Sequence, residues 1–319
     1  MAGELVVSTG ARSAEDAMRA SFGALDTPGH GDAELTISEI TTPAVVLGAF
    51  QRHHAASLLD TPLLRRGSGG AFVTVGPGTL HVLLNLAHVS ALVACDAGRL
   101  VNRYVRPLLR ALTKWGALAH YFGRDWISVA HQPVAEVGFA HDTVTGRATF
   151  EAFVAVRYPF APAGRGSFMG KEPRTLEAVA PRGEAHDTAK LSELIVNAYA
   201  AAGSRTVRRR THAETVEGLA GSAVSLADPP WAAVEAEAIG DVAAGRDAAG
   251  VLRLGGDLLA SRDALLRVAE RVERLGAADE AAIGTIVNGE LGSPRVALQG
   301  VRDLGSIGRV LASAVTRRP

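Results

Sequence analysis

The residues with the clearest chemical potential lie in one polar, glycine-rich segment that leads directly into an apolar strand. It reads Leu64-Arg65-Arg66-Gly67-Ser68-Gly69-Gly70-Ala71-Phe72-Val73. Paired guanidinium groups can bind a carboxylate or a phosphate, and adjacent glycines let backbone N–H groups approach a ligand closely. The segment is neither a P-loop nor a Rossmann fingerprint, because no Gly-Lys-Ser/Thr follows and a strand, not a helix, comes next. It predicts an anion-binding loop, with a tight turn that carries surface arginines as the alternative.

The other reactive side chains form no recognisable catalytic or metal-binding pattern. Cys95 is the only cysteine, which excludes an intramolecular disulfide, and such a residue is more often a small buried side chain than a nucleophile. His53 and His54 are adjacent, so on a helix they would point about 100° apart and could not easily bind one metal. Ser68 lies in no Gly-x-Ser-x-Gly turn. We therefore predict no metal site from these residues, while the order of serine, histidine and aspartate residues leaves a Ser-His-Asp arrangement open.

Around the arginine loop the chain resembles the lipoate-protein ligases, together with their octanoyltransferase and biotin protein ligase relatives. Residues 43–51 are similar to the family's segment of proline, apolar strand, glycine and glutamine, and residues 65–70 match its arginine-pair and Ser-Gly-Gly signature. Residues 171–180 resemble the connection to the ligases' accessory domain, and residues 255–259 a glycine-aspartate element within that domain. The similarity spans most of the chain in the right order, and two of its motifs are specific.

The resemblance implies a pocket for a medium-chain acyl group and, in the ligases, for an acyl-adenylate. The ligands would then be lipoate or octanoate and ATP, and the partner would be a lipoyl-domain or other acceptor protein. The substrate-binding positions that the family's motifs mark in this sequence are Arg65, Arg66, Ser68, Gly69, Gly70, Ala71, Pro133 and Gly138.

The lysine that the family uses to hold the acyl carbonyl and the phosphate is missing. The family places it in a Lys-x-Ser-Gly-x-Ala segment, which reads Gln132-Pro133-Val134-Ala135-Glu136-Val137-Gly138-Phe139 here. The alignment puts Pro133 at the lysine and Glu136 at the motif glycine. Proline supplies no donor, a carboxylate repels an acyl-phosphate, and no lysine occurs between Lys114 and Lys171. The family's third loop glycine is replaced by Ala71.

These departures favour a non-catalytic relative that binds an acyl ligand or a partner protein, with no catalytic residue. Three alternatives stay open. The chain could be an active lipoyl- or octanoyl-protein ligase or transferase with non-standard site residues, a hydrolase or other enzyme that uses the same pocket, or a purely structural subunit.

Hydrophobic periodicity places these segments on helices and strands. Helices are expected at 13–25, with Ser13 as cap, at 96–116 with a kink or late start at Pro107, and at 188–202, 261–275, 277–287 and 301–315. Strands are expected at 34–40, 44–47, 71–75, 80–86, 126–129, 137–140 and 148–156, with a further hairpin formed by 231–244 and 251–254. The pattern predicts an α/β (α+β) protein in which a mixed sheet with flanking helices precedes a small α+β C-terminal domain.

The length of 319 residues suggests two domains. We expect a lipoate ligase-like domain at 1–180, a linker and helix at 181–212, and an accessory domain at 213–319. The arginines at 205–210 indicate a solvated linker, or else a contact with an acidic partner.

The net charge of zero gives no general attraction to nucleic acid or anionic membranes. No apolar run reaches the roughly 18 residues of a membrane helix, and the N-terminus does not resemble a signal peptide. We therefore expect a cytoplasmic protein with no nucleic-acid or membrane partner.

Overall fold

The structure is a computed structural model, and it describes residues 3–51, 61–161, 167–180, 187–211, 231–247, 249–276 and 279–316. The adjacent histidines His53 and His54 lie outside the described residues, and so does the expected domain boundary near residue 213.

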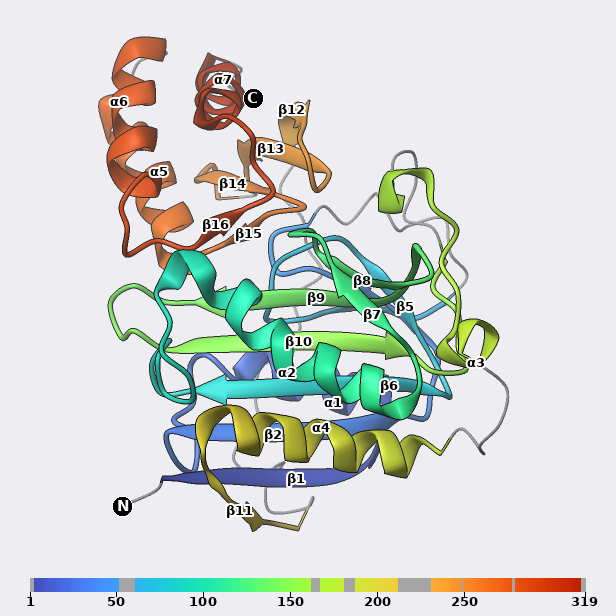
Figure 1. The fold of residues 1–319 in the computed structure, drawn as a ribbon. Coiled ribbons are helices and arrows are strands. Elements are labelled where there is room, and N and C mark those ends of the chain that lie inside the picture. The colour runs from blue at the N-terminus through green and yellow to red at the C-terminus, as the bar shows by residue number, and fades with distance from the viewer. Residues whose placement is uncertain are drawn as a thin grey trace.

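Within the described residues, an eight-stranded mixed sheet forms the centre of the molecule (Figure 1). In spatial order its strands are β11 (Thr206–Arg209), β1 (Glu4–Arg12), β2 (Ala33–Ile40), β6 (Thr79–Leu86), β10 (Ala148–Ala155), β9 (Gln132–His141), β8 (Trp126–Val129) and β7 (Ala119–Tyr121). Strand β1 runs parallel to β11 and β2, and the remaining neighbours are antiparallel. The expected class, a mixed sheet with flanking helices, is confirmed.

Helices α2 (Leu100–Trp115) and α4 (Thr188–Gly203) cover one face of the sheet, which is apolar. The two helices pack on each other, and Tyr199 Oη donates a hydrogen bond of 2.8 Å to the carbonyl of Tyr104. Helix α2 contains Pro107 and starts late, at Leu100, after a short 3₁₀ turn at Ala97–Arg99. Pro107 is the eighth residue of α2, so it lies inside the helix, where its missing N–H removes one hydrogen bond of the helix.

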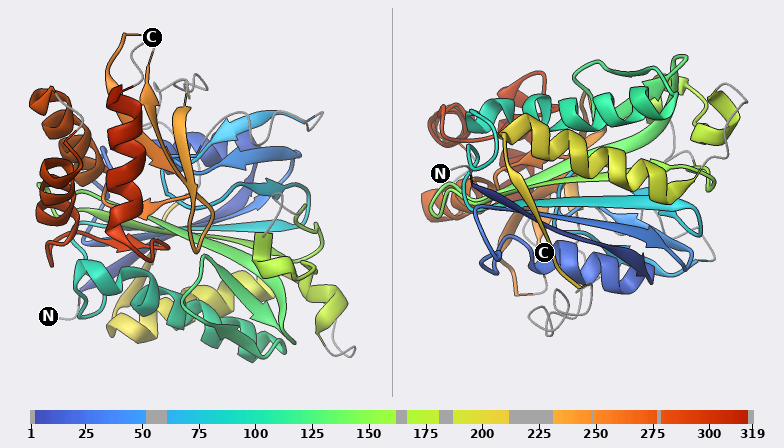
Figure 2. Two further views of the ribbon diagram at one scale, coloured as in Figure 1. Left: turned by 90° about the horizontal axis from the view of Figure 1, so that it is seen from above. Right: turned by 60° about the horizontal axis from the view of Figure 1, so that its bottom comes forward.

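Helix α1 (Ala14–Gly23) lies on the opposite face (Figure 2), and Ser13 Oγ caps it by accepting from the backbone N–H of Asp16 at 3.1 Å. This face is polar although it is buried. Because directly paired residues share a face, the register places Ser38 beside His81, Thr36 beside Leu83, and Leu83 beside Glu151. Its buried polar side chains are Ser8, Glu34, Thr36, Ser38, His81, Glu136, Thr149 and Glu151. The chemistry of the molecule is therefore concentrated on the α1 side of the sheet.

The C-terminal residues form sheets and a core of their own (Figure 1). They comprise β12 (Trp231–Ala236), β13 (Asp241–Arg246), β14 (Leu252–Gly256), β15 (Leu259–Ala260), α5 (Arg262–Leu275), α6 (Glu280–Leu291), β16 (Leu298–Gln299) and α7 (Leu304–Thr316). The first arm of the expected hairpin is divided into β12 and β13 by a turn. The domain division at 180 and 213 stays a proposal.

The arginine stretch that was expected to be a linker forms edge strand β11 of the large sheet. Arg208 pairs with Glu4 at 2.8 Å, and Arg209 pairs with Glu193 at 2.6 Å. These two guanidinium groups have partners within the chain, which argues against an acidic partner at this strand. None of the described helices is both long and apolar enough to cross a bilayer.

The hairpin turn between β8 and β9 carries backbone strain. Val129 and Gln132 pair directly, and the two residues between them, Ala130 and His131, have φ of 48° and 65°. Such left-handed two-residue turns favour Asn-Gly, because a Cβ there costs about 1 kcal/mol or more.

We expect the double substitution Ala130→Asn/His131→Gly to stabilise the protein by about 1 kcal/mol, because Asn-Gly relieves this strain. Thermal unfolding measures the effect. His88→Gly, at an exposed loop histidine without positive φ, is the matched control and should give no gain. A lower melting temperature of the double variant would show that the turn is held by other contacts.

Candidate functional site

The arginine–glycine loop, residues 66–72, lies between two strands of a small sheet, β4 (Leu63–Arg65) and β5 (Val73–Val75), which both pair with β3 (Ala44–Leu47). The backbone N–H of Arg66 donates to the carbonyl of Leu47 at 2.9 Å, and the N–H of Gly67 donates to Ser21 Oγ on α1 at 3.0 Å. The loop is thereby held between α1 and the polar face of the large sheet.

The backbone donors of Gly69 and Gly70 are engaged within the protein. Gly69 N–H donates to the carbonyl of Phe139 on β9, and Gly70 N–H donates to the carbonyl of Leu258, both at 2.9 Å. A Cβ on Gly69 would lie 2.2 Å from the Leu258 oxygen. The glycines permit a close approach, as expected, but of the protein's own backbone.

Gly138 on β9 completes this contact. A Cβ there would lie 2.6 Å from the Gly69 carbonyl oxygen and 2.7 Å from Ser68 Oγ. The structure thus brings the loop and Gly138 together, as the family resemblance implied.

Both arginines are buried, so the alternative of a tight turn with surface arginines is wrong. Arg65 Nη1 donates to the carbonyls of Gly48 at 3.0 Å and Gln51 at 2.7 Å. Arg66 is fully buried, and its Nη2 donates to the carbonyls of Gly69 and Ala71 at 3.0 Å each. These bonds use the arginines to fix the fold of the loop.

Ser68 belongs to a buried network that sequence analysis did not single out. Its hydroxyl donates to one carboxylate oxygen of Glu151, and His81 Nε2 donates to the other at 2.6 Å. Burial would raise the pKa of Glu151, but the hydrogen bond and charge of His81, with Arg66 and Ser68, lower the pKa below its ordinary value. Glu151 is therefore an anion that anchors the loop to the sheet. The only sequence signal was a polar residue within each of two apolar strands.

Glu136 and Asp125 form the acidic side of the site. Burial raises the pKa of Glu136 well above its ordinary range, with Arg66 opposing and Asp125 and Asp257 adding to the shift. Burial likewise raises the pKa of Asp125 to about 6. Within the described part of the chain, Glu136 Oε2 and Arg66 Nε and Nη1 have no hydrogen-bond partner. Arg66 is the buried cation that opposes the cost of these carboxyl groups.

Aromatic and apolar side chains pack beneath Arg66. Its guanidinium lies 5.2 Å from the centre of the Phe153 ring, and Phe153 belongs to the same buried cluster as Met18, Trp126 and Phe168. Pro133 is buried at the start of β9, and its carbonyl accepts from the N–H of Arg174 at 2.9 Å. The position aligned with the family's lysine thus supplies no cation.

Lys171 lies closer to this cluster than its sequence suggests. It follows a 3₁₀ turn at Ser167–Gly170 and precedes the short helix α3 (Leu176–Val179). Its Nζ lies 5.4 Å from the centre of the Trp126 ring, and Trp126 pairs directly with Glu136. Lys171 is half-buried, although its neighbours Gly170 and Glu172 are exposed.

The C-terminal part of the chain covers the loop. Besides the Leu258 carbonyl, His141 Nδ1 and Ser261 Oγ share a hydrogen bond of 2.8 Å, and the N–H of Thr143 donates to Asp263 at 2.9 Å. The arginine–glycine loop is therefore buried under residues that follow it by most of the chain length.

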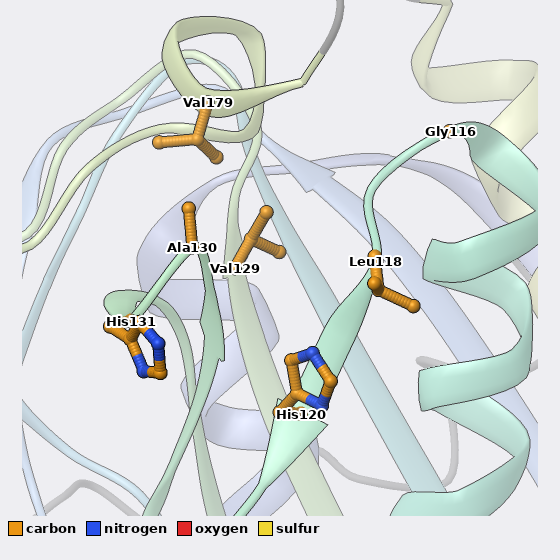
Figure 3. A pocket seen from close by; sticks show the side chains of 7 residues that line it. All are labelled: Gly116, Leu118, His120, Val129, Ala130, His131 and Val179. Carbon is orange, nitrogen blue, oxygen red and sulfur yellow. The ribbon is translucent and has the colours of Figure 1, made fainter.

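Two other candidate features lie apart from the loop. Burial raises the pKa of the Cys95 thiol to about 11, which argues against a thiolate nucleophile. Figure 3 shows a hollow of about 290 Å³ at the far end of β7 and β8, lined by Gly116, Leu118, His120, Val129, Ala130, His131 and Val179. None of these lining residues belongs to the loop or contacts it in the interactions above.

No family model and no curated protein sequence matches the chain. Among solved structures, the bi-partite lipoate protein ligase of Thermoplasma acidophilum aligns with a TM-score of 0.53 at 13% identity, over 69% of this chain and 90% of that chain. A lipoate-protein ligase A bound with ATP aligns with a TM-score of 0.54 at 14% identity, over 69% and 92%. P. falciparum LipL1 in complex with lipoate aligns with a TM-score of 0.61 at 8% identity, over 98% of this chain and 100% of that chain.

The chain has the fold of the lipoate-protein ligases. The resemblance carried by residues 65–70 is thereby confirmed at the level of architecture. At sequence identities of 8–14%, the structural similarity establishes the lipoate-ligase fold and does not establish the reaction. The alignment over 98% of the chain includes the C-terminal part, so the lipoate-ligase likeness is not confined to the large sheet.

We expect Gly138→Ala to destabilise the protein by about 1–3 kcal/mol, because the added methyl group overpacks the contact with Gly69 and Ser68. Urea unfolding measures the change. Gly289→Ala is the control, since it adds the same atoms where nothing lies within 4 Å and should be neutral or stabilising. Equal effects of the two substitutions would show that the loop does not sit tightly on β9.

We expect Glu136→Gln to stabilise the protein at pH 7 by roughly 1 kcal/mol or more, because it removes a buried carboxyl group whose pKa is raised. Below about pH 4 the carboxyl is protonated in both folded and unfolded states, so the gain should vanish there and grow as pH rises. Urea unfolding at pH 4 and pH 7 measures it, with exposed Glu15→Gln as control. A loss of stability at pH 7 would mean that Arg66 requires the Glu136 charge.

Proposed function

We propose that this protein is a non-catalytic relative of the lipoate-protein ligases, a pseudoenzyme that binds a partner protein or its acyl group. One observation carries the proposal: the fully buried Arg66 lies close enough to Glu136 to oppose the rise of its pKa, while Pro133 stands where the family has its lysine. An acyl-phosphate needs a concentration of positive charge and free donors. Here the buried cation already compensates the protein's own acids.

The loop hydrogen bonds support the same proposal. The N–H groups of Gly69 and Gly70, which could bind a ligand oxygen, donate to the carbonyls of Phe139 and Leu258. A ligand that used them would have to displace two backbone acceptors. This favours docking of a partner at the surface over deep binding of a free acyl group.

The proposed partner is a lipoyl-domain protein. The T. acidophilum ligase, which has the same fold, is described as part of a lipoylation system with its E2 lipoyl domain. Lipoate or octanoate and ATP would be needed only if the chain is active. A cytoplasmic location belongs to the same proposal.

We expect that incubation with a lipoyl domain, ATP and lipoate or octanoate gives no mass gain of the domain, and that no lipoyl-adenylate forms. Pro133→Lys should not create either activity, since Glu136 would pair with the new ammonium group and compete for it. Mass spectrometry of the domain and pyrophosphate release measure the two steps, with an active lipoate-protein ligase as positive control. Binding of the lipoyl domain without a mass gain supports the proposal, and a mass gain overturns it.

The second candidate is an active ligase or transferase with non-standard residues, and the position of Lys171 favours it. Its Nζ lies against Trp126, next to Glu136 in the sheet register, so one cation other than the loop arginines lies close to the site. Pyrophosphate release that depends on lipoate and is abolished by Lys171→Ala would establish this alternative. Lys190→Ala, at an exposed lysine on α4, is the control.

A further inference from the structure

A small cavity with several polar side chains lies on the α1 side of the large sheet, outside the arginine–glycine loop. Its volume is about 90 Å³, and it lies between α1, residues 27–30 and strands β1, β2 and β6. Its polar lining residues are Arg12, Thr27, His30, Glu34, Thr36 and Asn85. The lipoate-ligase motifs of the sequence include none of them.

Two oxygen acceptors in this cavity lack donors within the described residues. They are Glu34 Oε1 and Asn85 Oδ1, and the Glu34 side chain is only 4% exposed. Glu34 and Asn85 pair directly across β2 and β6, so their side chains start about 5 Å apart on one face. Leaving a buried carboxylate oxygen without a donor is costly. The cavity is therefore built to receive a group that donates hydrogen bonds.

A third acceptor completes the set. Thr36 follows Glu34 by two residues on β2 and so lies on the same face. Its hydroxyl shares a hydrogen bond of 3.2 Å with Ser8 Oγ and keeps acceptor capacity. Three acceptors thus converge on one small space.

One buried carboxylate at the cavity, that of Glu34, has an oxygen atom without a donor among the described residues. Burial lowers the pKa of Arg12, while Asp16 first and Glu34 second oppose this shift, and Asp16 also pairs with Arg19 at 3.4 Å. Glu34 Oε2 accepts from the backbone N–H of His30 at 3.3 Å, which is not a cation.

The other cations near the cavity are bound elsewhere. Arg147 Nη2 donates to the carbonyls of Ala24 and Thr27, and Arg147 lies near Asp26. Arg208 pairs with Glu4 and also donates to the carbonyl of His30 at 3.2 Å. Of the carboxylates that line or flank the cavity, Glu34 is the one that keeps an oxygen atom free for a ligand.

We propose that this cavity binds a primary ammonium group. An ammonium has three donors and one positive charge, which match three acceptors, one of them an oxygen of a buried carboxylate that lacks a donor. The cavity has room for about three water molecules, so it fits the head group and its first carbons, and the rest of the ligand would leave past residues 27–30. A free alkylamine and a lysine side chain of a partner protein share this chemistry.

The test adds three probes, one at a time, to the full chain. Binding is monitored by the NMR chemical shifts of Ala20, Ala24 and Asn85. The probes are propylammonium, Nα-acetyl-lysine methylamide and, as an uncharged control, 1-propanol. We expect saturable shifts with at least one of the amines and none with 1-propanol. Equal binding of both amines points to a lysine-bearing partner, and binding of propylammonium alone points to a free amine. No saturable shift with either amine, or equal binding of 1-propanol, would overturn the proposal.

Glu34→Gln separates binding from structure. This substitution should lower the affinity for the amine by about tenfold or more, since a charge-assisted hydrogen bond is lost. Glu15→Gln should leave binding unchanged. Without amine, Glu34→Gln should melt at or above the wild-type temperature, and the amine should raise the melting temperature of the wild type only. A variant that melts lower and binds the amine as the wild type does would assign Glu34 a purely structural role.

Discussion

The buried guanidinium of Arg66 is the interaction on which the loop, the sheet and the acidic residues all depend. It binds the carbonyls of Gly69 and Ala71, lies over Phe153, and stands near the buried Glu136, Asp125 and Glu151. Glu151, whose pKa is lowered, is the carboxylate whose removal would leave this buried cation without compensation. The arginine that in an anion-binding loop would face a ligand is here a part of the protein's own charge balance.

Sequence analysis predicted the architecture where periodicity and burial agree. Strands β2, β6 and β10 alternate and were found, whereas β1 was missed because Leu5-Val6-Val7 is continuous and apolar and is followed by small residues. Strand β11 was predicted to be a linker because all its residues are exposed and two of them, Arg208 and Arg209, are arginines. Such an edge strand carries no hydrophobic pattern, so only pairing with β1 defines it.

The candidate site was predictable in part. The arginine–glycine loop and Glu136 stood out by residue type, and they do lie together. His81 and Glu151 did not, because what joins them to Ser68 is the strand register and not their spacing along the chain. The partners of the Gly69 and Gly70 N–H groups were equally hidden, since the Leu258 acceptor comes from the far end of the sequence.

The Leu258 carbonyl makes the C-terminal part an intramolecular competitor for the loop. Because it is tethered to the same chain, it is present at an effective concentration on the order of millimolar or above, whatever the concentration of protein. Any ligand that accepts a hydrogen bond from the Gly70 N–H would have to compete with the Leu258 carbonyl, which already accepts this hydrogen bond. The apparent affinity of such a ligand for the loop would be its intrinsic affinity reduced by the fraction of molecules in which the Leu258 carbonyl has left the Gly70 N–H.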